Sequence, residues 1–184
     1  YIFLFINLIS ITGCSNLNKN EVHDICSSST FPCLLSTEYV LLITNKGKIK
    51  LELYGGSAPI TVGNFIDYVE KGRYDKTIFN RVIKDPYPFI IRGGANGLIK
   101  SNNNSIDNID KVRYIPLEIK LKTNSLPTYG KQINTSSQKN KIELKHERSS
   151  LSMARSEKLN SASFQFYISL KPLPELDGRF AVFG

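Results

Sequence analysis

The sequence predicts a mostly β domain that contains one amphipathic helix. Two runs of β-branched and aromatic residues, 77–83 and 89–94, flank a proline-containing break, which is typical of two strands joined by a loop. Residues 39–44 and 48–54 form a second such pair, and residues 62–69 carry the apolar spacing of a helix. With 184 residues, the chain is long enough for one domain with a hydrophobic core.

The first predicted hairpin turns at residues 45–47. Its second strand alternates, because Ile49, Leu51 and Leu53 share one face and charged residues occupy the other. One face of this strand is therefore expected in water. The run 39–44 is more uniformly apolar, so we expect it to be covered on both faces.

The predicted helix begins near Pro59 and ends before Gly72, residues that commonly mark the start and the end of a helix. Its apolar face contains Val62, Phe65 and Val69. These residues recur at the spacing that places them on one side of the helix, where they can face a core.

Arg81 lies inside the apolar run 77–83 and requires an explanation, because a guanidinium keeps its charge within a protein. The side chain either lies on the solvent face, pairs with Glu52 or Asp85 across the sheet, or serves a functional site. The sequence pattern alone favours the first two alternatives.

Composition argues against several classes of function. The net charge is +8 and the pI is near 9.4, but lysine and arginine are scattered and form no compact basic run interleaved with aromatic residues. A nucleic-acid partner is therefore not expected. The two histidines and three cysteines show no Cys-x-x-Cys or His-x-x-x-His spacing, so we expect neither a metal nor a cofactor.

The N-terminal segment resembles the export signal of a bacterial lipoprotein. Residues 1–13 are apolar and uncharged, too short for the roughly 20 residues that span a bilayer, and they end in Ile-Thr-Gly before Cys14. The resemblance implies a lipid on Cys14, which anchors the protein to a membrane in the cell envelope, facing the periplasm. A buried strand is the alternative. Because the chain starts at Tyr1 without a basic region, we expect that its first residues are missing.

Residues 14–37 are mostly polar and are expected to form a tether between the anchor and a domain at residues 38–184. Cys26 and Cys33 lie in this tether and enclose a short loop. In an oxidising compartment they form either a disulfide or two free, buried thiols.

Residues 98–147 are rich in asparagine, serine and lysine and are longer than a loop usually is in a compact domain. We expect a long surface insertion with one short extended piece at residues 114–119.

Several separated motifs resemble the signature blocks of the cyclophilin family of peptidyl-prolyl isomerases. They follow one another in the family's order at residues 79–83, Gly93 and Gly94, residues 151–155, residues 165–168 and residues 176–184. The resemblance covers residues 39–184. It implies an antiparallel β-barrel whose mouth is plugged by the predicted helix, and a monomer that acts on proline-containing polypeptides. Cyclophilins continue with a helix and a closing strand, so we expect this chain to be incomplete at its C-terminus.

The resemblance also assigns roles to individual residues. Arg81 matches the catalytic arginine of the family. The matching substrate-binding positions are Phe89, Ile90, Arg92, Ala154, Arg155, Gln165, Tyr167, Leu176 and Phe180. Without the resemblance, the apolar members of this set would be plain core residues.

This chain departs from the family pattern at several positions. Ile90, Tyr167 and Phe180 replace a methionine, a phenylalanine and a histidine and keep the pocket apolar or aromatic, but the Tyr167 hydroxyl needs a partner or water.

Other departures have larger expected effects. Arg92 replaces a glutamine that orients the catalytic arginine and the substrate carbonyl, and implies either lower turnover or a tighter grip on acidic substrates. Arg155 replaces an asparagine, and Glu175 replaces the tryptophan of cyclosporin-sensitive members, so we expect weak cyclosporin binding. The loop at residues 85–88 is longer than usual, which predicts a shift of Phe89.

The chemistry of prolyl isomerisation fits this set of residues. Rotation about an X–Pro bond faces a barrier of about 18–20 kcal/mol, and no covalent step is needed. An apolar pocket for the ring and a fixed donor for the prolyl nitrogen are sufficient, and Arg81 is suited to the second task. The alternative function is a cyclophilin-like peptide-binding module or chaperone with little catalysis.

Overall fold

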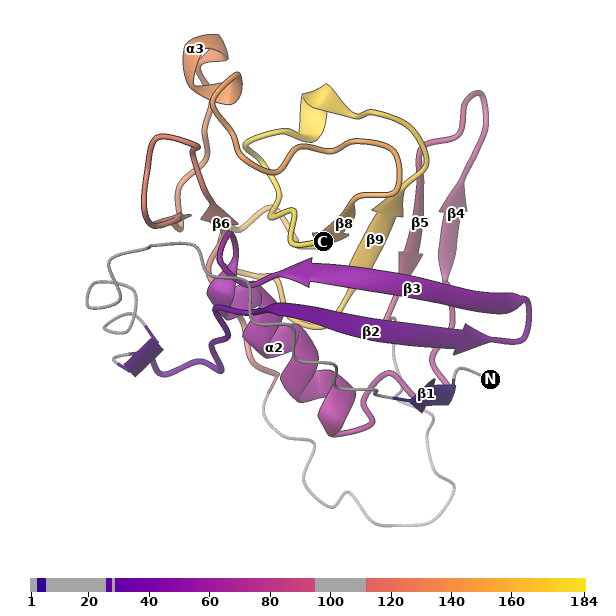
Figure 1. Cartoon of the computed structure of the whole chain (residues 1–184). Coiled ribbons are helices and arrows are strands. Elements are labelled where there is room, and N and C mark those ends of the chain that lie inside the picture. The colour runs from indigo at the N-terminus through magenta and orange to yellow at the C-terminus, as the bar shows by residue number, and fades with distance from the viewer. Residues whose placement is uncertain (1–2, 6–25, 28, 95–111) are drawn as a thin grey trace.

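The computed structural model describes residues 3–5, 26–27, 29–94 and 112–184, and for residues 3–5 it describes the backbone alone. The first sheet contains β1 (Phe3–Phe5), β2 (Thr37–Thr44) and β3 (Gly47–Tyr54), antiparallel and in that order (Figure 1). The predicted hairpin is therefore confirmed. Strand β1 lies within the segment for which the sequence left a strand as the alternative.

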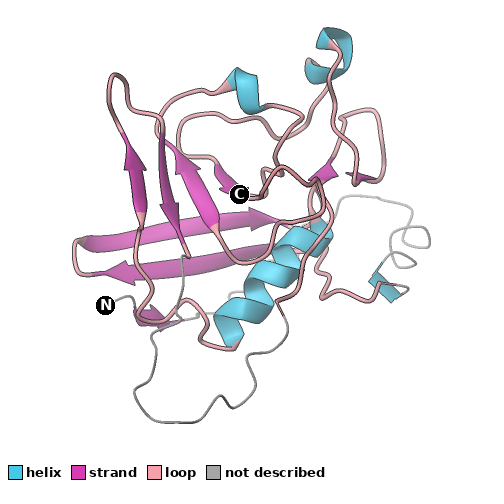
Figure 2. Ribbon diagram, turned by 180° about the vertical axis from the view of Figure 1, so that it is seen from behind, coloured by secondary structure: helices cyan, strands magenta, loops and turns pink. Residues whose placement is uncertain are grey.

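The second sheet contains four antiparallel strands in the order β4-β5-β9-β8. Their bounds are Arg81–Ile83 for β4, Ile90–Gly93 for β5, Leu151–Met153 for β8 and Phe166–Ser169 for β9. The hairpin predicted around Arg81 is thus present as β4 and β5. In both overall views, the β2–β3 hairpin runs across these strands (Figures 1 and 2).

Residues 181–184 join the two sheets. The Tyr54 amide donates to the Phe183 carbonyl at 2.8 Å, and the Phe183 amide donates to the Leu151 carbonyl at 2.9 Å. The Leu151 amide in turn donates to the Gly184 carbonyl at 2.8 Å. Strands β3 and β8 are therefore linked through the last residues of the chain, which gives one antiparallel β array around the main core.

Helix α2 (Pro59–Glu70) confirms the predicted helix and packs its apolar face into that core. The Phe65 ring is fully buried, and its centroid lies 4.9 Å from that of Tyr74, 5.6 Å from that of Phe166 and 5.3 Å from that of Phe183. The helix thereby contacts both the four-stranded sheet and the segment that joins the sheets.

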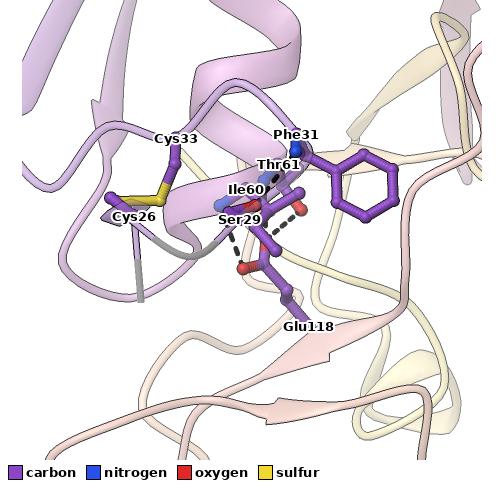
Figure 3. The surroundings of a disulfide bond; sticks show 7 residues. All are labelled: Cys26, Ser29, Phe31, Cys33, Ile60, Thr61 and Glu118. Atoms are coloured by element: carbon purple, nitrogen blue, oxygen red, sulfur yellow. Dashed lines mark hydrogen bonds between the residues drawn. A yellow bond between two sulfur atoms is a disulfide. The ribbon is translucent and has the colours of Figure 1, made fainter. Parts of the chain in front are cut away.

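A buried carboxylate binds the first turn of α2. The N-cap residue Ala58 supplies no side-chain acceptor. Glu118 does so instead: it accepts from the Ile60 amide at 3.0 Å, from the Thr61 amide at 2.6 Å and from the Thr61 hydroxyl. These bonds satisfy backbone donors that a helix leaves free at its N-terminus. Figure 3 shows Glu118 pointing at this turn.

The expectation that residues 39–44 are covered on both faces is wrong. Val40 and Leu42 are 2% and 1% exposed, whereas Tyr39 is 37% exposed, so β2 alternates like its partner. The reason is that one sheet face packs on the core and the other faces solvent, where Tyr39 donates a hydrogen bond to Glu52.

The expectation that residues 98–147 form a surface insertion is also wrong for the part from residue 112 onward. This part contains β6 (Glu118–Ile119), β7 (Thr128–Tyr129) and the short helix α3 (Ser136–Lys139). Its apolar residues form a second buried cluster with Ala181, made of Leu117, Ile119, Leu121, Ile133 and Ile142. The widely spaced apolar residues meet only in the folded chain, which is why the polar composition was misleading.

A disulfide joins Cys26 and Cys33, the pair that the sequence left either bonded or free. The bridged segment lies beside the start of α2 (Figure 3), and directly after it the Leu34 amide donates to the Pro59 carbonyl at 3.1 Å. Gly63 permits this approach, since a Cβ there would lie 2.5 Å from the Pro32 carbonyl oxygen.

Two further findings concern only the described part of the chain. It contains no group of three or more histidine, cysteine or acidic side chains that could hold a metal ion, and no helix that is long and apolar enough to cross a bilayer. Cys14 and most of residues 1–13 lie outside the described residues.

Candidate active site

Three predicted site residues lie in one row across the four-stranded sheet. Arg81 on β4 is paired with Arg92 on β5, and Arg92 is paired with Tyr167 on β9. Residues paired across antiparallel strands point to the same face and lie about 4.5–5.5 Å apart. Ile168 points to the opposite face, where it packs against the main core. The row therefore lies on the side of the sheet that faces away from that core.

The Arg81 side chain is exposed at the end of this row. None of the ion pairs between described residues includes Arg81, so the predicted alternative of pairing with Glu52 or Asp85 does not hold there. Its guanidinium is open to a ligand.

Asn80 holds the neighbouring strand and the Arg92 side chain. The Asn80 amide donates to the Arg92 carbonyl at 3.0 Å. In the orientation that satisfies both groups, the Asn80 side chain also donates to that carbonyl at 3.1 Å and accepts from Arg92 Nη2 at 3.2 Å. Arg92 Nε is buried without a hydrogen-bond partner among the described residues.

Tyr167 is the buried end of the row, because it is only 3% exposed. The sequence predicts that the Tyr167 hydroxyl needs a hydrogen-bond partner. That partner is His146, whose Nε2 lies 2.8 Å from the hydroxyl oxygen. His146 Nδ1 lies 2.8 Å from Asp177 Oδ1, and the same oxygen accepts from the His146 amide at 2.8 Å. All three side chains are buried.

The tautomer of His146 follows from these partners. A carboxylate only accepts, so Nδ1 carries the proton toward Asp177 and Nε2 accepts from the Tyr167 hydroxyl. Burial lowers the pKa of His146, against the opposing effect of Asp177, and the ring is therefore neutral near pH 7. Burial also raises the pKa of Tyr167, which keeps its hydroxyl protonated as a donor.

Tyr167→Phe is expected to lower the free energy of unfolding by about 1–2 kcal/mol, because it leaves His146 Nε2 buried without a partner. Urea denaturation of the variant and the parent checks this. Tyr114→Phe removes a hydroxyl from a side chain that is 58% exposed and is the matched control, with an expected change below about 0.5 kcal/mol. Equal losses in the two variants would contradict the buried bond.

Phe180 and Arg155 lie beside Tyr167. The Phe180 ring packs edge-on against the Tyr167 ring, with the centroids 6.0 Å apart, and the Arg155 guanidinium stacks 4.6 Å from the Phe180 centroid. Arg155 also donates to the Arg179 carbonyl at 2.8 and 3.0 Å and to the Ser156 carbonyl at 2.8 Å. Arg155 was predicted to line the groove, which stays a prediction; several of its donors bind the backbone carbonyls of Arg179 and Ser156.

The other predicted site residues lie close to the row or next to its strands. Ile90 is on β5, two residues before Arg92 and on the same face, and it is half-buried. The Ala154 amide donates to the Gln165 carbonyl at 2.9 Å, which continues the β8–β9 pairing. Leu176 is half-buried at the end of the 3-10 helix η1 (Pro174–Leu176), one residue before Asp177.

Phe89 follows the loop at residues 85–88 and directly precedes β5. Its amide donates to the Ile83 carbonyl at 2.9 Å, and its carbonyl accepts from the Leu170 amide at 2.9 Å. These bonds continue the ladders of β4, β5 and β9 through Phe89, and the expected shift of Phe89 relative to the family stays a prediction.

The end of β5 has no room for side chains at Gly93 and at Gly94, which follows the strand. A Cβ on Gly93 would lie 2.9 Å from the Phe166 ring and 3.0 Å from the Phe79 ring. Gly94 has a φ of +74°, and a Cβ there would lie 2.6 Å from the Phe164 carbonyl oxygen. A side chain at either position would push apart the strands that carry the row.

Comparison with known proteins decides the family. The family described as "Cyclophilin type peptidyl-prolyl cis-trans isomerase/CLD" matches residues 39–184. The chain belongs to the cyclophilin family. Peptidyl-prolyl cis-trans isomerase cypE of Dictyostelium discoideum is 36% identical over 151 residues, which cover 82% of this chain and 78% of that protein. Peptidyl-prolyl cis-trans isomerase A of Dickeya dadantii is 33% identical over 162 residues, covering 85% and 69%.

Solved structures agree with the cyclophilin fold. A cyclophilin-type isomerase of Cryptosporidium parvum, crystallised in the presence of the dipeptide Ala-Pro, has a TM-score of 0.52 and 31% identity and covers 80% of this chain and 77% of its own. Cyclophilin AquaCyp293 of Hirschia baltica has a TM-score of 0.54 and 20% identity and covers 92% and 70%, a likeness of fold alone. The protein is thus a peptidyl-prolyl cis-trans isomerase by family.

Sequence reasoning missed three polar residues that this cyclophilin uses inside the fold: His146, Asp177 and Glu118. The hydroxyl of Tyr167 was the one available signal, since a tyrosine in a core position requires a hydrogen-bond partner. The identity of that partner depends on contacts between distant segments. His146 and Tyr167 are 21 residues apart in the sequence, and His146 and Asp177 are 31 residues apart. No local pattern encodes such contacts.

Proposed function

We propose that Arg81 is the catalytic residue of this cyclophilin and that the row Arg81, Arg92 and Tyr167 marks its substrate groove. The observation that carries the proposal is an exposed guanidinium, free of ion pairs with the described residues, in register with an aromatic side chain two strands away. A proline-containing polypeptide binds with its ring on the apolar side chains and its prolyl nitrogen toward Arg81.

The proposed step makes and breaks no covalent bond. As the X–Pro bond twists, amide resonance is lost and the prolyl nitrogen becomes pyramidal, so that it can accept a hydrogen bond. A guanidinium cannot deprotonate, and one directed at the prolyl nitrogen stabilises this state more than the planar ground state. Each 1.36 kcal/mol of this difference gives about a tenfold gain in rate.

The test is exchange NMR on an Ala-Pro-Phe peptide with the purified chain. We expect cis-trans exchange to accelerate in proportion to the protein concentration. A chain that binds the peptide, seen as chemical-shift changes, without accelerating exchange would overturn the catalytic proposal. It would favour the second candidate, a peptide-binding module.

One observation favours that second candidate: Arg92 stands directly opposite Arg81, where like charges oppose each other. If this repulsion displaces the Arg81 guanidinium, Arg92→Gln will raise turnover of neutral peptides severalfold. Unchanged or lower turnover in Arg92→Gln would exclude this explanation for a weak enzyme.

We further propose that the protein is lipid-anchored through Cys14 in a bacterial envelope and assists the folding of exported proteins. Two observations support this. The residues before Cys14 resemble the cleavage site of a bacterial lipoprotein signal, and the Cys26–Cys33 disulfide suits an oxidising compartment. Expression of the complete reading frame in a bacterium with labelled palmitate tests the anchor. Label on the parent chain and none on Cys14→Ser is expected, and label on both would contradict it.

A further inference from the structure

Three guanidinium groups surround the aromatic residues of the candidate site. Arg92 is paired with Tyr167 across β5 and β9, and Arg81 is paired with Arg92 one strand further out. On the other side of Tyr167, the Arg155 guanidinium covers the Phe180 ring, which packs on Tyr167. The site is therefore flanked by positive charge from two directions.

No carboxylate of the described residues forms an ion pair with Arg81, Arg92 or Arg155. The nearby Asp177 is buried and is occupied by His146. The positive charge of the site is thus not neutralised by an ion pair within the part of the chain that the structure describes.

Neither arginine of the row forms an ion pair with a described residue. Arg92 Nη2 bonds to Asn80, and Arg92 Nε is buried without a partner in the described structure, so Nε is not itself open to a ligand. Because Arg81 and Arg92 are directly opposite each other, their charges repel. An anionic group bound between them would relieve this repulsion and accept charge-assisted hydrogen bonds, for which a guanidinium is well suited.

We infer that this site selects proline-containing polypeptides that carry a carboxylate side chain on the residue immediately before the proline. The inference rests on the proposed function, because it assigns the substrate class of the same groove. The carboxylate binds Arg92 and, through the shared row, Arg81. A free anion such as inorganic phosphate offers the same chemistry, so the experiment must separate the two sources.

The experiment measures kcat/KM by exchange NMR for three acetylated peptides that differ only before the proline: Ala-Glu-Pro-Phe, Ala-Gln-Pro-Phe and Ala-Lys-Pro-Phe. At low salt we expect the glutamate peptide to exceed the glutamine peptide by about 3–10-fold, and the lysine peptide to be slowest. The glutamate advantage should fall to about twofold or less near 0.3 M salt, since exposed charges are screened.

Arg92→Gln is expected to reduce the glutamate advantage, taken as the ratio of kcat/KM for the glutamate peptide to that for the glutamine peptide, to less than about twofold, whatever the variant does to the absolute rates. Lys46→Gln is the matched control, because it removes the same charge from the exposed β2–β3 turn. It should retain the full advantage. An advantage lost equally in both variants would mean that net charge is responsible, and would overturn the inference.

The remaining outcomes separate the inference from the proposed function. Equal turnover of all three peptides would overturn the substrate preference and leave the isomerase intact. Acceleration of none of them would overturn the proposed catalysis itself. Adding inorganic phosphate tests the other source of the anion. If phosphate inhibits turnover of the glutamine peptide, and the glutamate peptide has no advantage when phosphate is absent, the arginines bind a free anion and the inference is overturned.

Discussion

Replacing Arg81 with alanine will lower kcat/KM for prolyl isomerisation by about 100-fold or more, the size of effect seen when one preorganised donor to a transition state is removed. Arg81 is exposed and makes no ion pair with the described residues, so its removal leaves no buried partner unsatisfied. Exchange NMR on the Ala-Pro-Phe peptide measures the loss. The free energy of unfolding, measured by urea denaturation, should change little, because surface substitutions usually alter it by less than about 0.5 kcal/mol.

Two further variants make this result specific. Lys84→Ala removes an exposed positive charge three residues along the same hairpin and should keep most of the activity. Arg81→Lys keeps the charge but loses the planar set of donors, and we expect it to fall well below the parent. Equal rates for Arg81→Ala and the parent would exclude Arg81 as the catalytic residue.

Glu118→Ala is expected to lower the free energy of unfolding by about 3 kcal/mol or more. The Glu118 side chain is 1% exposed and accepts three hydrogen bonds from Ile60 and Thr61. Its removal leaves two helix amides buried without acceptors and also creates a cavity, and each effect costs about 1–3 kcal/mol. Chemical denaturation measures the loss. Glu143→Ala, which removes a partly exposed carboxylate paired with Lys120, is the control and should cost under about 1 kcal/mol.

Glu118 also predicts how stability depends on pH. Burial raises its pKa to about 7, despite the opposing hydrogen bonds from Thr61 and Ile60. Because the pKa is higher in the folded state than in the unfolded state, the proton stabilises the fold at low pH, and this contribution is lost as the pH rises through about 7.

We therefore expect the unfolding free energy of the parent to fall by roughly 2–3 kcal/mol between pH 5 and pH 8 relative to Glu118→Gln, which cannot ionise. Denaturation of both proteins across this range provides the measurement. Parallel pH profiles would show that Glu118 is ionised throughout the range and that its pKa is not raised.

The elements that could be predicted from the sequence are those encoded by local periodicity. Helix α2 and the β2–β3 hairpin follow from spacings of three to four residues and of two residues, which decide locally which face is apolar. The candidate site came from motifs that resemble those of a family. Residues 112–147 were misjudged, because Leu117, Ile133 and Ile142 are too far apart in sequence to show a pattern.

Arg155 and Tyr167 show the same limit within the site. Their positions were predicted, but not that Arg155 would bond to the Arg179 carbonyl, nor that Tyr167 would bond to His146. The partner of a polar side chain is set by the path of other segments, and one residue type can be satisfied in many ways.

By itself, the sequence determined the β2–β3 hairpin, the β4–β5 hairpin and helix α2, which family the chain resembles, and which arginine is suited to the chemistry. Only the tertiary structure decided that Arg81, Arg92 and Tyr167 share one face, that Glu118 binds α2, and that residues 181–184 join the two sheets. The physical reason is range: secondary structure depends on neighbours a few residues apart, whereas strand register and buried hydrogen bonds depend on segments that meet only when the chain folds.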